Sequence, residues 1–506
     1  MKNRDRNEFK DRNGRPGSSL EQNPQERRAW KKKSKKKQKK VSGGREYVVV
    51  SYAFVAIFLA LIGYIVYFNT QLSEEFQNSP YNKRQNAYEE QVVRGDITAA
   101  GGEVLAETQT DGEGNEYRVY PYSNLFSHVV GYNTKGRSGL ESTENYHLLT
   151  SHAGAIEQVQ KELRDEKNMG DTVVTTLDLE LQQTAYDALG GYNGAVVVME
   201  PDTGKILAMV SKPDFDPNSL DEIWDTLVSD ESNTNLLNRA TQGLYPPGST
   251  FKIVTTLAYL RSGENINDFH FDCQGEVTNG GYTIHCYNNN VHGPEDFATA
   301  FAKSCNSAFA QLGVDLNRTE FRNTAQDVLF NRDLPLDLPY SRSSFDLDKD
   351  TADALAMQTA IGQGDTLASP FHMALITCAV ANGGNLMEPY LVDRIENYNG
   401  EQVKKYTPSV SSQLMTSDEA ALISELMKGV VENGTASMLS GRGYTAAGKT
   451  GTAEHGDMTE SPHAWFVGFS NVDNPDIVVS VIAESAGTGS DVAVPIASQI
   501  FDAYYN

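Results

Sequence analysis

With 506 residues, the chain is longer than one compact core usually holds, so its length excludes a single small domain and predicts two or three. Its composition, 39% hydrophobic and 22% charged, is ordinary for a globular chain. The net charge of −24 is unevenly distributed, because residues 1–45 contain 17 Lys and Arg but only 5 Asp and Glu. A basic head is therefore followed by a strongly acidic body.

An uncharged segment of 22 residues, Tyr47 to Phe68, follows the basic head. As a helix that rises about 1.5 Å per residue, it spans a hydrocarbon core of about 30 Å. We therefore predict a transmembrane helix within residues 46–69. The lysine-rich run at 31–40 predicts that the tail, residues 1–45, is cytoplasmic and meets anionic lipid, so everything after about Asn69 would lie outside the cell membrane.

Three other interpretations of these segments are less favoured. A signal peptide has a shorter apolar core and a small-residue cleavage site, whereas this segment is long and ends in YFNTQ. A buried core helix seldom avoids every charge over 22 residues. A nucleic-acid-binding arm would also be basic, but beside a membrane span the lysines more simply orient the helix, and we expect no nucleic-acid partner.

A small juxtamembrane module, residues 70–185, is predicted to precede a larger domain, residues 186–506. In the module, residues 92–108 alternate apolar and polar side chains around Gly-Gly like a hairpin, and a strand followed by a helix is expected from Asp171. The larger domain begins with two apolar runs at 194–211. Their Pro-Asp-Thr-Gly junction predicts an antiparallel hairpin.

Helical patterns dominate the middle of the chain, and strand patterns return near its end. Helices are expected after Ser249, at 294–312, around 350–360 and across 367–382, and two antiparallel strands are expected at 463–484. A final helix closes the chain. Strands at both ends of a domain with helices between them predict an α+β fold, one antiparallel sheet flanked by helices.

The candidate chemistry begins with a Ser-x-x-Lys motif at Ser249 and Lys252. Residues three apart share one face of a helix, so the lysine amine can approach the serine hydroxyl, and a desolvated lysine near another cation can act as a base. The preceding Pro-Pro-Gly is consistent with a nucleophile at a helix N-terminus. The same motif occurs by chance at Ser34 to Lys37, inside a run of solvated charges.

Two further motifs follow, Ser-x-Asn at Ser304 and Asn306, and Lys-Thr-Gly at Lys449 to Gly451 with Thr452 next. The order and spacing of the three motifs resemble those of the serine penicillin-recognising enzymes. The resemblance implies a nucleophile at Ser249.

Nearly everything after the apolar segment resembles the class B penicillin-binding proteins, monofunctional transpeptidases of the penicillin-binding protein 2 or division type. Residues 92–108, VVRGDITAAGGEVLAET, resemble the RGxIxDRxGxxLA segment of that family's N-terminal module, and residues 131–141 resemble its GxxGxE segment. NRATQGLYPPGSTFK, AIGQGDTLASP and AAGKTGTAE resemble its transpeptidase domain. One departure is Ala99 and Ala100, where the family commonly has Asp and Arg.

The resemblance implies that Ser249 attacks the carbonyl of a D-Ala-D-Ala stem peptide, expels the terminal D-Ala and becomes an acyl-enzyme that β-lactams also form. Lys252 would be the base, and Ser304 would relay a proton to the leaving amine. Asn306 would hold the donor peptide and Lys252, and Lys449 would supply positive charge near Ser304 and the substrate carboxylate.

The rest of the site follows from the same resemblance. Thr450 and Thr452 would bind the substrate carboxylate, with Gly451 between them on the strand. The backbone N–H groups of Ser249 and Thr452 would form the oxyanion hole, a device worth about 3 kcal/mol per donor in acyl transfer. No cofactor is implied.

Peptidoglycan stem peptides, β-lactams, membrane lipid and a polytopic membrane glycosyltransferase are the partners that the resemblance implies. Two other functions stay open. A D,D-carboxypeptidase or β-lactamase would pass the acyl group to water, although no segment identifies the deacylating Glu of class A β-lactamases. A β-lactam-binding scaffold or sensor would need no turnover.

Four cysteines are too few for a disulfide scaffold, yet an exported domain can keep a single bridge. Cys273 and Cys286 are the candidate pair, because the Gly-Gly between them could turn the chain back, and the bridge stays open. Cys305 and Cys378 are expected to be packing residues. His285, His455 and His463 lack metal-ligand spacing, so we expect no metal.

Overall fold

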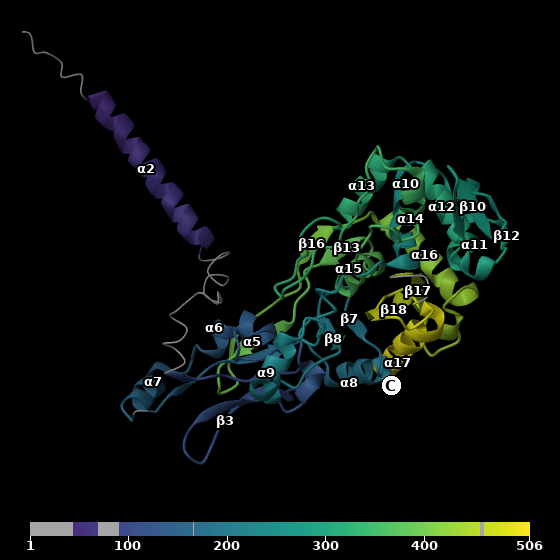
Figure 1. Ribbon diagram of the computed structural model, residues 1–506. Coiled ribbons are helices and arrows are strands. Elements are labelled where there is room, and N and C mark those ends of the chain that lie inside the picture. Colours follow the sequence, from purple (N-terminus) through teal and green to yellow (C-terminus); the bar gives the residue numbers. More distant parts are fainter. Residues whose placement is uncertain (1–43, 69–90, 165, 456–459) are drawn as a thin grey trace, which may run out of the picture. The chain divides into compact units, whose positions relative to one another are not determined.

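The computed structural model describes residues 44–68, 91–164, 166–455 and 460–506 (Figure 1). The chain divides into two compact units, Met1–Ser73 and Glu74–Asn506. The first contains helix α2, Gly44–Tyr67, and its stretch Tyr47–Tyr67 is long and apolar enough to cross a membrane. The predicted apolar helix is therefore confirmed as a helix. Most of the basic tail and the segment 69–90 lie outside the described residues.

A five-stranded antiparallel sheet, with strand order β17-β18-β19-β7-β8, forms the centre of the second unit. Every residue of β7, β18 and β19 is buried, so both faces of this sheet are covered. Helix α15 contacts β7, β18 and β19, while α8 contacts β7 and β8 and packs on the C-terminal helix α17. The predicted α+β fold, an antiparallel sheet flanked by helices, is confirmed. The bounds are β7 Gly194–Met199, β8 Ile206–Lys212, β17 Ala446–Ala453, β18 His463–Ser470, β19 Val478–Ala483, α8 Leu179–Leu189, α15 Pro370–Ala381 and α17 Val494–Tyr505.

Most predicted elements are found close to their expected bounds. The hairpin at 194–211 is β7 and β8, and the two late strands are β18 and β19. The helix expected at 294–312 is wrong as a single element, because the chain breaks it into α11, Phe297–Ala302, and α12, Asn306–Asp315. The remaining α-helices of the described residues are α5 Gly139–Thr143, α6 Asn145–Leu148, α7 Ala155–Glu162, α9 Leu220–Ser229, α10 Lys252–Arg261, α13 Arg318–Asp327, α14 Asp353–Ala360 and α16 Ser417–Asn433.

A second sheet has six strands in the order β15-β14-β6-β2-β3-β4. It combines strands from the start of the unit with two strands from much later in the chain, which chain order alone does not reveal. β6 pairs in parallel with β2 and antiparallel with β14. The bounds are β2 Ile97–Thr98, β3 Val104–Thr110, β4 Glu116–Val119, β6 Thr172–Thr175, β14 Val392–Glu396 and β15 Gln402–Lys405.

A buried ion cluster joins the segment 92–108 to the segment 131–141. Arg94, from the first segment, donates from Nε to Oε2 of Glu141, from the second, at 2.6 Å. Arg118 on β4 donates to Oε1 of the same carboxylate at 2.7 Å, and the Glu141 side chain is fully buried. Burial alone would raise the pKa of Glu141, but Arg118 and Arg94 together lower it below its usual value. One carboxylate therefore ties together residues 94, 118 and 141.

We expect the substitution Glu141→Gln to lower the free energy of unfolding by about 3 kcal/mol, because it leaves two buried guanidinium groups without their anion. Urea unfolding of the detergent-solubilised protein, followed by circular dichroism, measures this change. The control is Glu425→Gln, since Glu425 forms only an exposed pair with Lys428 at 3.5 Å and should change stability little. Equal effects of the two substitutions would contradict the assigned role of Glu141.

Candidate active site

The Ser-x-x-Lys motif lies at the junction of a 3-10 turn, η4 Gly248–Phe251, and helix α10. Ser249 is half-buried in the turn, whereas Lys252 is the first residue of α10 and is fully buried. Gly248 has a φ of +53°, and a Cβ atom there would lie 2.9 Å from the carbonyl oxygen of Thr452. A glycine therefore lets the serine turn approach strand β17 closely.

The Ser-x-Asn motif lies at the break between α11 and α12. Ser304 has a left-handed φ of +58°, which ends α11 and turns the chain into α12. The Cys305 side chain caps α12 by accepting a hydrogen bond from the Ala308 backbone N–H. This break explains why the predicted continuous helix fails, and it directs the side chains of Ser304 and Asn306 toward Lys252.

Three hydrogen bonds hold the Lys252 amine against the Ser-x-Asn motif. Its Nζ lies 2.8 Å from the Ser304 carbonyl oxygen, 3.2 Å from Ser304 Oγ and 2.9 Å from Asn306 Oδ1. Lys449, on β17, donates to the same Ser304 Oγ at 2.9 Å. The Ser304 hydroxyl oxygen therefore accepts from two lysines, which leaves its own proton available to a third group.

Both lysines are buried, and no carboxylate among the described residues pairs with either of them, which disfavours their charged forms. Burial lowers the pKa of Lys252 to about 8. Burial, and then the nearby charge of Lys252, lower the pKa of Lys449 well below its usual range. A lysine with a pKa near 8 has an appreciable neutral fraction at physiological pH and can accept a proton.

The Lys-Thr-Gly motif lies on β17, beside the serine turn. The Thr450 hydroxyl is buried and lies 2.5 Å from the Thr435 hydroxyl. Thr435 follows the end of α16, and nothing in the sequence predicts that it lies near the site. Thr452 is half-buried, and its hydroxyl accepts from the Gly489 backbone N–H at 3.4 Å. Gly451 has no room for a side chain, because a Cβ atom would lie 2.9 Å from the Pro247 carbonyl oxygen.

The structure thus brings the three motifs together, with one difference from the local geometry expected. Within the described part of the chain, no hydrogen bond joins Ser249 to Lys252, although the two residues are one turn apart. The lysine amine is bound instead by Ser304 and Asn306, because the carbonyl and amide oxygens of the α11–α12 break are closer acceptors.

The predicted cysteine pair is adjacent but unbonded: the Sγ atoms of Cys273 and Cys286 lie 3.6 Å apart, and all four cysteines are free.

Comparison with known families and proteins places this architecture. Residues 194–502 match the penicillin-binding protein transpeptidase domain, and residues 94–173 match the penicillin-binding protein A dimerisation domain. Peptidoglycan D,D-transpeptidase PbpA of Mycolicibacterium smegmatis is 33% identical over 88% of this chain and 96% of its own length. Stage V sporulation protein D of Bacillus subtilis is 30% identical over 76% of this chain and 63% of its own length.

Solved structures agree with the sequence relatives. Penicillin-binding protein A from M. tuberculosis, solved as a ceftriaxone acyl-enzyme complex, has a TM-score of 0.75 and 30% identity, covering 83% of this chain and all of that one. The D,D-transpeptidase domain from Eggerthella lenta has a TM-score of 0.73 and 32% identity, covering 81% of this chain and 97% of that one. The chain therefore belongs to the class B penicillin-binding proteins, as its motifs predict.

We expect Gly451→Ala to slow acylation by a fluorescent penicillin about tenfold to a hundredfold, because the new methyl group would push the backbone at Pro247, and with it Ser249, away from β17. Rates of labelling at several penicillin concentrations measure this effect. The matched control is Gly429→Ala in α16, where a Cβ atom meets nothing within 4 Å and alanine favours the helix. Unchanged labelling of the Gly451 variant would contradict the inferred tight approach.

Proposed function

We propose that this protein is an extracytoplasmic peptidoglycan D,D-transpeptidase that works through an acyl-enzyme on Ser249. The observation that supports this most strongly is the sharing of one hydroxyl, Ser304 Oγ, by two buried lysines, Lys252 and Lys449, next to a half-buried serine turn. Such an arrangement supplies a neutral amine as base and a hydroxyl that can pass on a proton.

In the acylation step, Ser249 Oγ attacks the carbonyl carbon of the penultimate D-Ala, and neutral Lys252 receives its proton. The tetrahedral intermediate collapses as the C–N bond to the terminal D-Ala breaks, and the leaving amine takes a proton from Ser304, which is replenished from the lysines. An amine of a second stem peptide then attacks the ester, so that the peptide cross-link forms and Ser249 is released. A β-lactam ring opens in the same first step but keeps its amine attached.

Substrate recognition is assigned to β17 and the backbone beside it. Lys449 provides positive charge near Ser304, and Thr450 and Thr452 bind the terminal carboxylate. The backbone N–H groups of Ser249 and Thr452 stabilise the oxyanion. The close approach of Gly248 to the Thr452 carbonyl supports this last assignment, because it places the two backbone segments side by side.

Membrane attachment and a partner complete the proposal. Helix α2 would anchor the chain as a single span, with the basic tail in the cytoplasm and the residues beyond Asn69 outside. The transpeptidase cross-links glycan that another enzyme makes, so a polytopic membrane glycosyltransferase is the expected partner. Helix α2 and the module at 70–185 are the expected contact surfaces.

We expect Ser249→Ala to abolish stoichiometric labelling by a fluorescent penicillin, whereas Ser34→Ala, in the chance copy of the motif, should label like the unmodified protein. The label on the unmodified protein should persist for hours, because a transpeptidase deacylates slowly with water. Gel fluorescence after a chase with unlabelled penicillin measures both quantities. Persistent labelling of the Ser249 variant would refute the nucleophile, and rapid loss of label would identify a β-lactamase.

The acylation rate should rise with pH, because only neutral Lys252 can accept the serine proton. With a pKa of about 8, the neutral fraction grows roughly tenfold from pH 6 to pH 7, reaches about half at pH 8 and levels off above about pH 9. Stopped-flow acylation between pH 6 and pH 9 tests this profile. Lys252→Arg should be inactive throughout, since a guanidinium does not deprotonate in this range, and a flat profile in the unmodified protein would exclude Lys252 as the base.

A further inference from the structure

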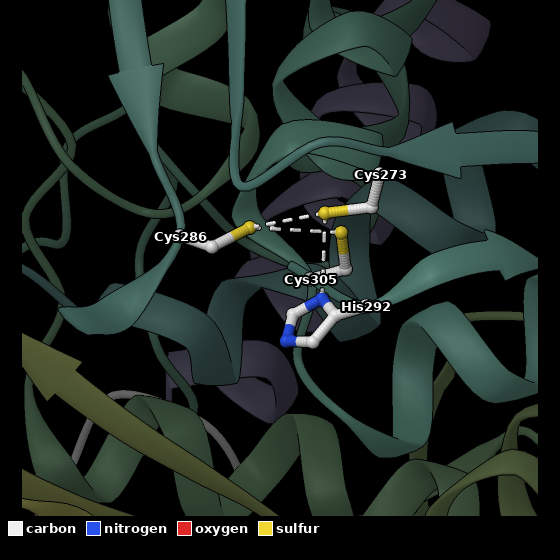
Figure 2. A group of neighbouring side chains, drawn as sticks. All are labelled: Cys273, Cys286, His292 and Cys305. Carbon is white, nitrogen blue, oxygen red and sulfur yellow. Dashed lines mark hydrogen bonds between the residues drawn. The ribbon is translucent and has the colours of Figure 1, made fainter. Parts of the chain in front are cut away.

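Three cysteines and one histidine converge beside the Ser-x-Asn motif (Figure 2). Cys273 ends β9, Phe271–Cys273, and Cys286 follows β11, Tyr282–His285. His292 precedes β12, Gly293–Glu295, and Cys305 caps α12. The sulfur and Nδ1 atoms all lie within 4.8 Å of one another, and the three cysteines are buried. Figure 2 shows the three sulfurs and the imidazole pointing toward a common centre.

Three of the six distances among these atoms match those of ligands around one tetrahedral ion, and the other three are no longer than 4.8 Å. Bond lengths of about 2.3 Å to sulfur and about 2.0 Å to nitrogen place tetrahedral sulfurs about 3.8 Å apart and a sulfur and a nitrogen about 3.5 Å apart. In the structure, Cys286 Sγ lies 3.6 Å from Cys273 Sγ and 3.8 Å from Cys305 Sγ. His292 Nδ1 lies 3.5 Å from Cys273 Sγ.

Each sulfur also accepts a backbone hydrogen bond, as thiolate ligands do. The Gly275 N–H donates to Cys273 at 3.4 Å, the Ser307 N–H to Cys286 at 3.5 Å and the Ala308 N–H to Cys305 at 3.4 Å. A neutral thiol is a weak acceptor, whereas a thiolate is a strong one. Three preformed N–H donors therefore suit three thiolates, and such surrounding hydrogen bonds orient metal ligands.

A buried carboxylate also lies beside the cluster. The Glu295 side chain is fully buried, and within the described residues neither of its oxygens has a hydrogen-bond partner. Its Oε1 lies 3.6 Å from His292 Nδ1, the same nitrogen that approaches the sulfurs. His292 Nδ1 therefore faces both the carboxylate and the sulfurs, and a cation bound among the sulfurs would weaken the repulsion between this carboxylate and the thiolates.

We propose that Cys273, Cys286, His292 and Cys305 bind one zinc-type divalent cation. Three thiolates and an imidazole are the ligands of four-coordinate structural zinc, and a closed set of four protein ligands leaves no position for a catalytic water. Binding replaces the three thiol protons, which are released to solvent. None of the histidines considered in the sequence analysis belongs to this set, because His292 meets the cysteines only through the fold.

The cation has a structural task in a part of the chain with almost no core. Residues 271–295 form two short antiparallel ribbons. In one, β9 pairs with β12, and in the other, β10, Glu276–Asn279, pairs with β11. Two of the five buried residues in this segment are the cysteines themselves. A small unit with so little apolar burial needs a staple. A Cys273–Cys286 disulfide would be one, but it would leave the convergence of Cys305 and His292 on the same point unexplained.

The cation also positions catalytic groups, an inference that rests on the roles proposed above for Ser304 and Asn306. Its ligand Cys305 lies between these two residues in sequence. The Asn306 amide donates to the carbonyl oxygen of His285, next to the ligand Cys286, at 3.2 Å. The cation thus fixes the ribbons to the α11–α12 break, where Ser304 adopts its left-handed conformation and holds Lys252. Its removal should slow acylation by at least about tenfold.

The test uses the detergent-solubilised full-length protein, purified without chelators. Elemental analysis should find one zinc per chain. Cys286→Ser and His292→Ala should lower this content, whereas Cys378→Ser, which alters the one cysteine outside the cluster, should keep it. After chelation, added cobalt(II) should produce the thiolate charge-transfer and tetrahedral ligand-field absorption, and added zinc should restore penicillin acylation. The cobalt spectrum needs no variant, so it reports on the site even where a variant misfolds.

Two results would overturn the proposal. One is a protein that contains no zinc and in which mass spectrometry of unreduced peptides finds a Cys273–Cys286 disulfide. The other is a protein with free thiols that takes up neither zinc nor cobalt(II). If the metal-loaded protein is not acylated by penicillin, the proposed function is wrong but the metal site stands. If acylation is equally fast with and without the metal, the cation does not position Ser304 and Asn306.

Discussion

The burial of two amines around one hydroxyl is the constraint on which the rest of the site depends. Lys252 and Lys449 are both 0% exposed, and both contact Ser304 Oγ. Removing an ammonium from water is expensive unless it is paired or neutralised. No carboxylate bonds either amine in the described part of the chain, so the fold offers them oxygen acceptors and the rings of Phe309 and Phe301, at 5.2 and 5.6 Å. The cost of burying a charged amine thereby lowers its pKa, so that part of the Lys252 population is neutral and can accept a proton.

That arrangement explains several features that would otherwise weaken the fold. Ser304 adopts a left-handed backbone conformation that a serine rarely takes, and it interrupts what would be a longer helix. Gly248 and Gly451 have no side chain to pack, and this lets η4 and β17 come into contact. Each costs some stability, and each brings one of the three motifs to the same oxygen. The extensive core of the five-stranded sheet offsets these local losses.

The sequence predicted much of this, and the failures have physical reasons. Apolar runs and turn residues located β7, β8, β18 and β19 because these elements form from local patterns. The interruption at Ser304 was missed because apolar periodicity continues through it, and only the tertiary bonds to Lys252 make the break favourable. Thr435 and His292 gave no signal in the sequence, since their neighbours come from distant segments. The membership of β14 in the second sheet was hidden for the same reason.

The second sheet has a consequence for how the chain is made. Ribosomes deliver residues from the N-terminus, so β2, β3 and β6 emerge well before β14, which begins at Val392. Until then the edge of β6 lacks the neighbour that it pairs with in the finished sheet. An open strand edge can recruit another chain. The edge of β6 therefore stays exposed until residue 392 has been synthesised. During this interval, a chaperone that covers the edge of β6 would favour folding over aggregation.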